Sequence, residues 1–144
     1  MCLLPPFFYF ATQNRQNALS LVDILKKNAR KYTVMDTQSA VTCTAKGNTL
    51  SVKICGEIDH HSVREVRERI DEALYHGMPK CLRIDLSEVS FMDSSGLGLI
   101  VGRVVSAREI GGTVEVVGAS ARIERILEMA GLFRMEGLTV KKGR

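Results

Sequence analysis

The chain reads KCLRIDLSEVSFMDSSGLGLIVGRVVSAREIGGTVEVV from residue 80 to residue 117. Its first part, Lys80–Leu86, alternates apolar and polar residues, which is typical of a half-buried strand. Apolar residues then recur three and four positions apart over residues 97–107, which predicts a helix with one buried face that ends at Gly111-Gly112. Thr113–Val117 is again rich in β-branched residues. This strand–turn–helix–strand order predicts a crossover between parallel strands.

The same alternation of elements continues on both sides of this stretch. The other predicted elements are a hairpin over residues 40–45 and 50–55, a helix that Asp59 can cap and that ends at His76-Gly77, a third helix over residues 120–131 and a short last strand over residues 138–140. We therefore expect one compact α/β domain with a mixed sheet of four to five strands and three to four helices.

The net positive charge of the chain comes from its N-terminal end. The 144 residues carry a net charge of +4, but residues 35–144 hold 15 Lys and Arg against 15 Asp and Glu. A charge-balanced domain gives no support for a nucleic-acid partner. We expect residues 1–34 to be an N-terminal extension, either disordered or preceding a true start at Met35, and residues 35–144 to be the working domain.

The extension does not predict export or a membrane span. Residues 1–11, MCLLPPFFYFA, are about half the length of a spanning helix and lack the basic start of a signal peptide. Residues 18–32 form a basic amphipathic stretch, which leaves association with a membrane surface as an open alternative. We expect a cytoplasmic protein with no membrane partner.

The turn Met92-Asp93-Ser94-Ser95-Gly96 carries the candidate chemistry. It precedes a predicted helix, where unpaired backbone N–H groups and the helix dipole favour negative charge. A phosphoserine at Ser94 or Ser95 would be stabilised there. The residues alone leave a second interpretation open, because Asp and Ser are also the preferred residues for an ordinary helix N-cap.

Other motif interpretations fail on spacing. The glycines at 96, 98 and 102 are one residue too widely spaced for a dinucleotide fingerprint, and neither a P-loop nor a nucleophile elbow is present. His60 and His61 are adjacent and would point about 100° apart on a helix, so they do not favour a metal site. The four cysteines contain no C-x-x-C pair and are interpreted as small thiols of an intracellular protein. No catalytic residue and no cofactor is expected.

Four segments together resemble a known family. Residues 91–103, FMDSSGLGLIVGR, resemble the signature turn and helix of STAS domains of the anti-sigma factor antagonist family. Residues 56–62, GEIDHHS, resemble the sporulation members, which antagonise the anti-sigma-F factor, more than the general-stress members. Gly111-Gly112 and residues 129–133 match in order and spacing. The resemblance covers about residues 38–136.

The resemblance implies a regulatory binding protein rather than an enzyme. The unphosphorylated antagonist would bind an anti-sigma factor that is also a serine kinase and so release a sigma factor. The kinase, using ATP and Mg²⁺, would phosphorylate the serine after the Asp of the turn, which is Ser94, with Ser95 as the runner-up. A PP2C-like phosphatase would restore the active form. The residues expected around the phosphorylation site and the partner surface are Asp59, Met92, Asp93, Ser95, Gly96 and Leu97.

Two alternatives to a sporulation role stay open. One is a general-stress antagonist of the same family, and the other is a STAS module that binds or slowly hydrolyses a nucleotide. The second is weaker because the sequence contains neither a Walker lysine nor a cluster of metal ligands.

Overall fold

The computed structural model describes residues 32–35 and 39–143. The strands within them are β1 (Tyr32–Met35), β2 (Ser39–Lys46), β3 (Thr49–Ile58), β4 (Cys81–Met92), β5 (Thr113–Val117) and β6 (Leu138–Val140). The helices are α3 (Val63–Gly77), α4 (Ser94–Glu109) and α5 (Ala121–Met129), and a 3₁₀ turn, η1 (Leu132–Arg134), follows α5. The predicted α/β domain is confirmed.

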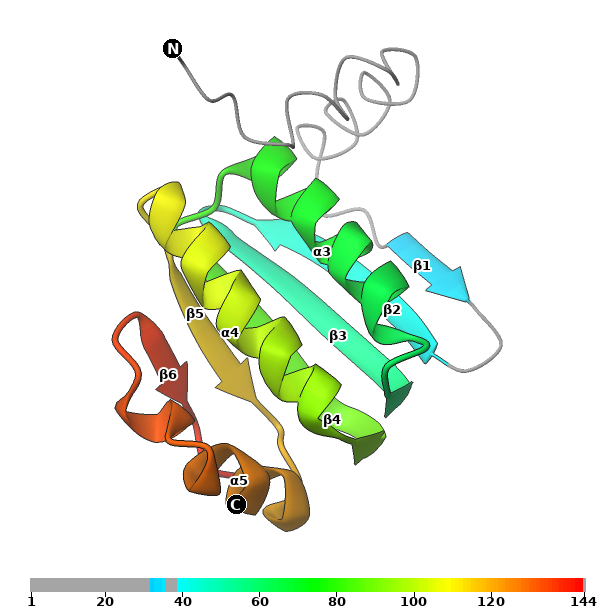
Figure 1. Cartoon of the computed structure of the whole chain (residues 1–144). Helices are drawn as coiled ribbons and strands as arrows, with labels where there is room; N and C mark the ends of the chain where they lie inside the picture. Colours follow the sequence, from blue (N-terminus) through cyan, green and yellow to red (C-terminus); the bar gives the residue numbers. More distant parts are fainter. Residues whose placement is uncertain (1–31, 36–38, 144) are drawn as a thin grey trace, which may run out of the picture.

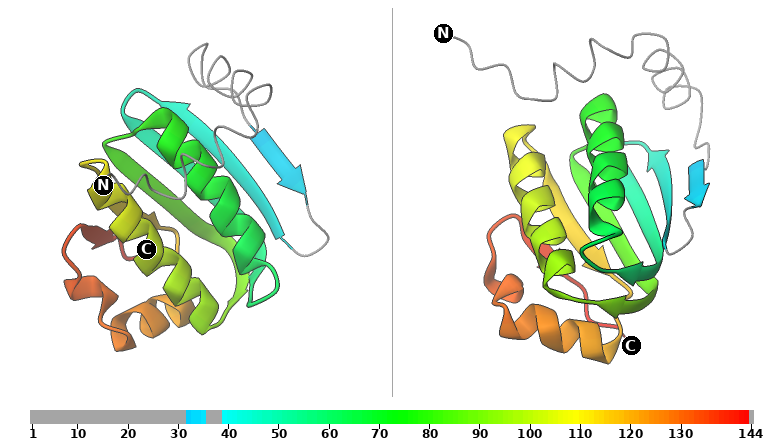
Figure 2. Two further views of the ribbon diagram at one scale, coloured as in Figure 1. Left: turned by 45° about the horizontal axis from the view of Figure 1, so that its top comes forward. Right: turned by 45° about the vertical axis from the view of Figure 1, so that its right-hand side comes forward.

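All the described strands form one mixed sheet in the order of the sequence, β1 to β6 (Figure 1). The pairs β1–β2 and β2–β3 are antiparallel, whereas β3, β4, β5 and β6 run parallel to one another. The sheet has one strand more than the four to five expected, because β1 adds to the outer edge of β2. Helices α3 and α4 cover the same face of the sheet and lie side by side (Figure 2).

The central strand β4 is longer than predicted. It pairs with β5 only as far as Asp85, but it continues beside β3 to Met92. The predicted end at Leu86 was wrong because the pairing of β3 with β4 shifts register twice. One shift lies between Lys53 and Cys55, and the other lies between Gly56 and Glu57. Such shifts break the strict alternation on which the prediction relied. Because of this extra length, β4 and β3 end side by side, at Met92 and Ile58.

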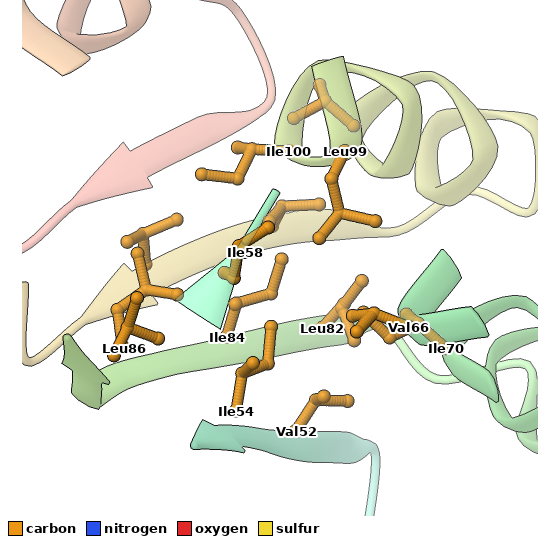
Figure 3. Packing of buried hydrophobic residues seen from close by; sticks show 14 of the residues in the cluster. Val52, Ile54, Ile58, Val66, Ile70, Leu82, Ile84, Leu86, Leu99 and Ile100 are labelled. Carbon is orange, nitrogen blue, oxygen red and sulfur yellow. The ribbon is translucent and has the colours of Figure 1, made fainter. Parts of the chain in front are cut away.

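A single apolar core fills the space between the sheet and its helices (Figure 3). Its fully buried members include Val52 and Ile54 from β3, Leu82 and Ile84 from β4, Val66 and Ile70 from α3, and Ile100 from α4. Burial of these side chains is the main favourable contribution to folding. The three cysteines in the described part of the chain are unpaired, and burial raises the pKa of the Cys43 thiol to about 12.

The expected division at residue 35 falls inside β1. Tyr32–Met35 pairs with β2 from Cys43 to Ala40, so residues 32–34 belong to the sheet. Residues 1–31, with most of the basic amphipathic stretch and Cys2, lie outside the described residues. The division into an extension and a domain stays a prediction.

Gly112 provides a test of the packing between the turn that follows α4 and the segment that precedes β4. A Cβ atom there would lie 2.9 Å from the Pro79 carbonyl oxygen and 3.2 Å from that of Lys80, and backbone atoms cannot move aside easily. We expect Gly112→Ala to lower the free energy of unfolding by about 1–3 kcal/mol in urea titrations. The matched control is Gly98→Ala, whose Cβ would meet no atom within 4 Å. It should leave stability unchanged or raise it by up to about 1 kcal/mol. Equal urea midpoints for the two variants would contradict this packing.

Candidate functional site

Two loops meet where the parallel strands β3 and β4 end. β3 ends at Ile58 and leads into residues 59–62, which precede α3, whereas β4 ends at Met92 and leads into Asp93, which precedes α4. The backbone N–H of Asp93 donates a hydrogen bond to the Ile58 carbonyl oxygen, with the two atoms 3.2 Å apart. The pairing of β3 with β4 therefore fixes the two loops side by side at one edge of the sheet.

The turn after β4 is closed by the Asp93 side chain. Asp93 has extended backbone and is the N-cap of α4, and its carboxylate accepts a hydrogen bond from the Ser95 N–H at 2.7 Å. The N–H of Gly96 donates to the Asp93 carbonyl oxygen at 3.0 Å. Asp93 therefore already satisfies part of the donor set that a phosphate would otherwise use. The N-cap interpretation is confirmed, and it is compatible with a modifiable serine next to it.

The two serines of the turn differ in exposure. Ser94 is exposed at the first position of α4, whereas Ser95 is half-buried. A kinase must reach the hydroxyl of the residue that it modifies, so the exposure favours Ser94 over Ser95. A phosphate on Ser94 would lie close to the Asp93 carboxylate and would make this helix end strongly negative.

Gly96 lets α4 start directly on top of the strand end. Gly96 and Met92 are both buried, and a Cβ at position 96 would collide with the Met92 side chain and lie 3.4 Å from Ile58. The close approach therefore requires a residue without a side chain. Leu97, one residue further, is half-buried and packs against the core cluster.

The neighbouring loop is held by Asp59 and Ser62. The Asp59 carboxylate accepts hydrogen bonds from the N–H groups of His61 and Ser62, each at 2.9 Å. The Ser62 hydroxyl is buried and donates to the Glu57 carbonyl oxygen at 2.9 Å. These bonds, led by the one from Ser62, hold the pKa of Asp59 below its usual value. The expectation that Asp59 caps α3 was wrong, because the N-cap is Ser62. The Asp59 carboxylate instead accepts hydrogen bonds within the turn that precedes the helix.

Ser62 and the Ile58 carbonyl also hold the two loops, and neither was expected from the sequence. A signal for Ser62 was present, since a serine three residues after an aspartate can exchange hydrogen bonds with it. No sequence pattern identifies which carbonyl accepts the Asp93 N–H. The remaining predicted residues, Asp59, Met92, Asp93, Ser94, Ser95, Gly96 and Leu97, all lie on the two segments that meet at this edge.

His60 and His61 lie on the outer side of the same loop. Both side chains are exposed, and their ring centroids are 3.9 Å apart. Phe91, near the end of β4, is an exposed apolar side chain close to the turn, and it pairs in register with Glu57. The edge therefore combines exposed rings with the carboxylates of Asp59 and Asp93, a composition that suits contact with another protein.

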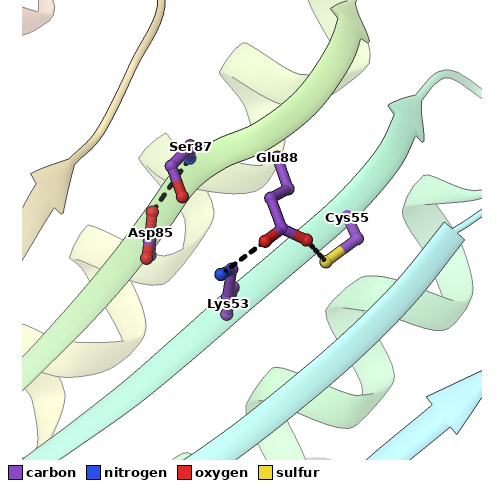
Figure 4. Close-up of polar contacts among 5 residues, drawn as sticks. All are labelled: Lys53, Cys55, Asp85, Ser87 and Glu88. Atoms are coloured by element: carbon purple, nitrogen blue, oxygen red, sulfur yellow. Dashed lines mark hydrogen bonds and ion pairs between the residues drawn. The ribbon is translucent and has the colours of Figure 1, made fainter.

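The face of the sheet that α3 and α4 do not cover, here called the open face, carries paired charged side chains (Figure 4). There the Glu88 carboxylate forms an ion pair with Lys53 at 2.7 Å and accepts a hydrogen bond from the Cys55 thiol at 2.9 Å. Arg83 and Lys141 both pair with Glu115 at 2.6 Å. The charges on this face are matched among themselves. Ser94 and its neighbours are not part of this network.

The described residues contain no group of three or more His, Cys, Asp or Glu side chains arranged to hold a metal ion. None of the described helices is long and apolar enough to cross a membrane.

Comparison with known proteins places this site in a family context. The family model of the STAS domain matches residues 40–142. The anti-sigma F factor antagonist of Paenibacillus polymyxa is 38% identical over 86 residues, which cover 60% of this chain and 74% of that protein. The anti-sigma-B factor antagonist of Bacillus subtilis is 38% identical over 85 residues, covering 59% and 76%.

Solved structures agree with the fold. The anti-sigma factor antagonist SpoIIAA in its unphosphorylated form superposes with a TM-score of 0.57 at 25% identity, covering 78% of this chain and 89% of that one. The phosphorylated form of SpoIIAA from Bacillus superposes with a TM-score of 0.53 at 25% identity, covering 78% and 92%.

The hydrogen bonds at Asp59 give a pH prediction. The carboxyl group should titrate below the ordinary value of 3.8 in the folded chain, which carbon-detected NMR can measure. Because folding favours the ionised form, its contribution to stability is present above the unfolded pKa and is lost as the pH falls through the folded pKa. Asp59→Asn should therefore make urea stability less sensitive to acid. Titration of Asp59 at or above 3.8 would show that these bonds do not hold the loop.

Proposed function

The chain belongs to the STAS domain family, within its group of anti-sigma factor antagonists, and on that premise we propose that it binds an anti-sigma factor and is switched off by phosphorylation of Ser94. The observation that carries the proposal is the exposed Ser94 at the first position of α4, directly after a carboxylate that caps the same helix. A related protein, SpoIIAA, has solved structures in an unphosphorylated and a phosphorylated form.

The switch works through local charge. A phosphate adds about −1.5 to −2 charges at neutral pH, and here it joins the Asp93 carboxylate at one helix end. The helix dipole and the exposure of Ser94 let the fold tolerate this charge. A partner that covers the turn must remove water from the same charge, and a penalty of about 3 kcal/mol would weaken binding roughly a hundredfold.

The partner of the unphosphorylated form would be an anti-sigma factor with serine kinase activity. That kinase would use cytoplasmic ATP and Mg²⁺, and a PP2C-like phosphatase would reverse the modification. The chain itself would act as ligand and substrate, with no catalytic residue and no cofactor of its own. A role in sporulation is favoured by the resemblance of residues 56–62, and a general-stress role is the alternative. Relative affinity for the anti-sigma-F and anti-sigma-B factors separates the two.

The site assignment is tested by phosphorylation in vitro. Incubation with the cognate anti-sigma factor kinase and ATP should add one phosphate to the wild-type chain and to Ser95→Ala, and none to Ser94→Ala. Intact mass and peptide mapping measure the outcome. A Ser94→Ala chain that still gains one phosphate would move the site to another residue.

The electrostatic switch is tested by a charge at the same position. Ser94→Asp should stay folded, which circular dichroism measures. Its affinity for the anti-sigma factor should be lower than that of the unphosphorylated wild type by at least about tenfold in calorimetry. The matched control is Ser120→Asp, which places the same charge at the N-cap of α5, where Ser120 is also exposed. That variant should bind like the wild type. Tight binding by Ser94→Asp, or equal loss in both variants, would contradict the account.

A further inference from the structure

Helices α3 and α4 run in the same direction across the sheet. Each one returns from the carboxyl end of a parallel strand, so the two helices start at the same edge (Figures 1 and 2). The loop of residues 59–62 precedes α3, and the Asp93 turn precedes α4. Any sliding or rotation of α4 against α3 would therefore change how Ser94 lies relative to the Asp59 loop.

One ion pair joins the two helices, with a buried Arg103 and a half-buried Asp71. Arg103 of α4 is 5% exposed and is the one buried charged residue among those that the structure describes. Its Nε atom lies 3.0 Å from Oδ1 of Asp71 on α3. The two atoms are at ion-pair distance without the alignment of a hydrogen bond, and Nη1 of Arg103 is buried without a hydrogen-bond partner in the described structure.

Joining two helices through this pair carries a desolvation penalty, because charge is removed from water. Burial lowers the pKa of Arg103 and raises that of Asp71, and the attraction between the two charges opposes both shifts. Buried ion pairs can often be replaced by apolar residues without loss of stability. Stability alone therefore does not account for Arg103.

Apolar side chains on α4 extend beyond its buried side. The buried side carries Leu99, Ile100 and Val104, whereas Leu97 and Val101 are half-buried and Val105 is 52% exposed. Apolar contacts are non-directional, so small rotations of such a helix change the buried apolar area only slightly. A charged residue that has one partner removes this ambiguity, as single polar residues do in coiled coils.

We propose that Arg103 and Asp71 are positioning residues that fix the alignment of α4 on α3, and thereby hold the Ser94 turn against the Asp59 loop. Arg103 lies nine residues after Ser94, about 14 Å along the helix, and touches neither loop. The effect on the partner rests on the proposed function, whereas the effect on the turn does not.

The test is the double variant Asp71→Leu/Arg103→Met, studied in the full chain. Urea unfolding should show stability equal to or above that of the wild type. In ¹H–¹⁵N spectra, the amides of residues 93–97 should broaden or split into several signals, while those of β5 stay single. With the cognate kinase, kcat/KM for Ser94 phosphorylation should fall about tenfold or more, because the acceptor is no longer held in one place.

Two further variants make each outcome decisive. Arg83→Met/Glu115→Leu removes the ion pairs that Arg83 and Lys141 make with Glu115 on the open face of the sheet, and it should leave the 93–97 amides and phosphorylation unchanged. Arg103→Lys keeps a cation next to Asp71 and should keep one set of 93–97 signals. Single sharp signals and wild-type phosphorylation in the double variant would overturn the positioning role. An unfolded double variant together with disturbed 93–97 signals in Arg103→Lys would also overturn it, because the pair would then be needed for stability in its wild-type form.

The two proposals fail in different ways. If no anti-sigma factor kinase phosphorylates the wild-type chain, the proposed function fails, but the amide signals still test the positioning role. If the wild type is phosphorylated and the double variant behaves in the same way, only the positioning role fails.

Discussion

The parallel pairing of β3 with β4 is the constraint on which the site depends. It runs from the hairpin end of β3 to Met92, beyond the point where β5 stops, and it ends in the hydrogen bond from the Asp93 N–H to the Ile58 carbonyl oxygen. Because parallel strands require a crossover, α3 and α4 both start at this edge. The loop held by Asp59 and the turn closed by Asp93 are therefore neighbours in space, although more than 30 residues separate them in the sequence.

The local chemistry of the turn follows from this placement. Gly96 brings the start of α4 against Met92, and the Asp93 carboxylate accepts a hydrogen bond from the Ser95 N–H. Ser94 is exposed directly beside that carboxylate. An added phosphate would change the surface charge without entering the core. The ion pair between the half-buried Asp71 and the buried Arg103 joins α3 to α4. The turn whose charge phosphorylation would change and the ion pair proposed to hold that turn are thus separate parts of the domain.

Much of this arrangement could be predicted from the sequence, for identifiable physical reasons. The alternation at Leu82, Ile84 and Leu86 and the helical spacing from Leu97 to Ala107 indicated the crossover, because both patterns report one buried face. The full length of β4 could not be predicted, since a shift of register hides the alternation. The role of Arg103 could not be predicted either, because its partner Asp71 is placed beside it by the tertiary structure. The role of Ser62 left a local signal, since its partners lie within five residues of it. The strand β1 pairs four residues from outside the segment that matches the family.

In the proposed function, the partner binds across the edge formed by residues 57–62 and 92–97. Amide hydrogen exchange of the full chain, with and without its anti-sigma factor, is the sharpest test of this surface. Binding there should slow exchange in both segments, and it should cause no slowing when Ser94 carries a phosphate. Slower exchange confined to the open face around Lys53 and Glu88, or to α5, would contradict it.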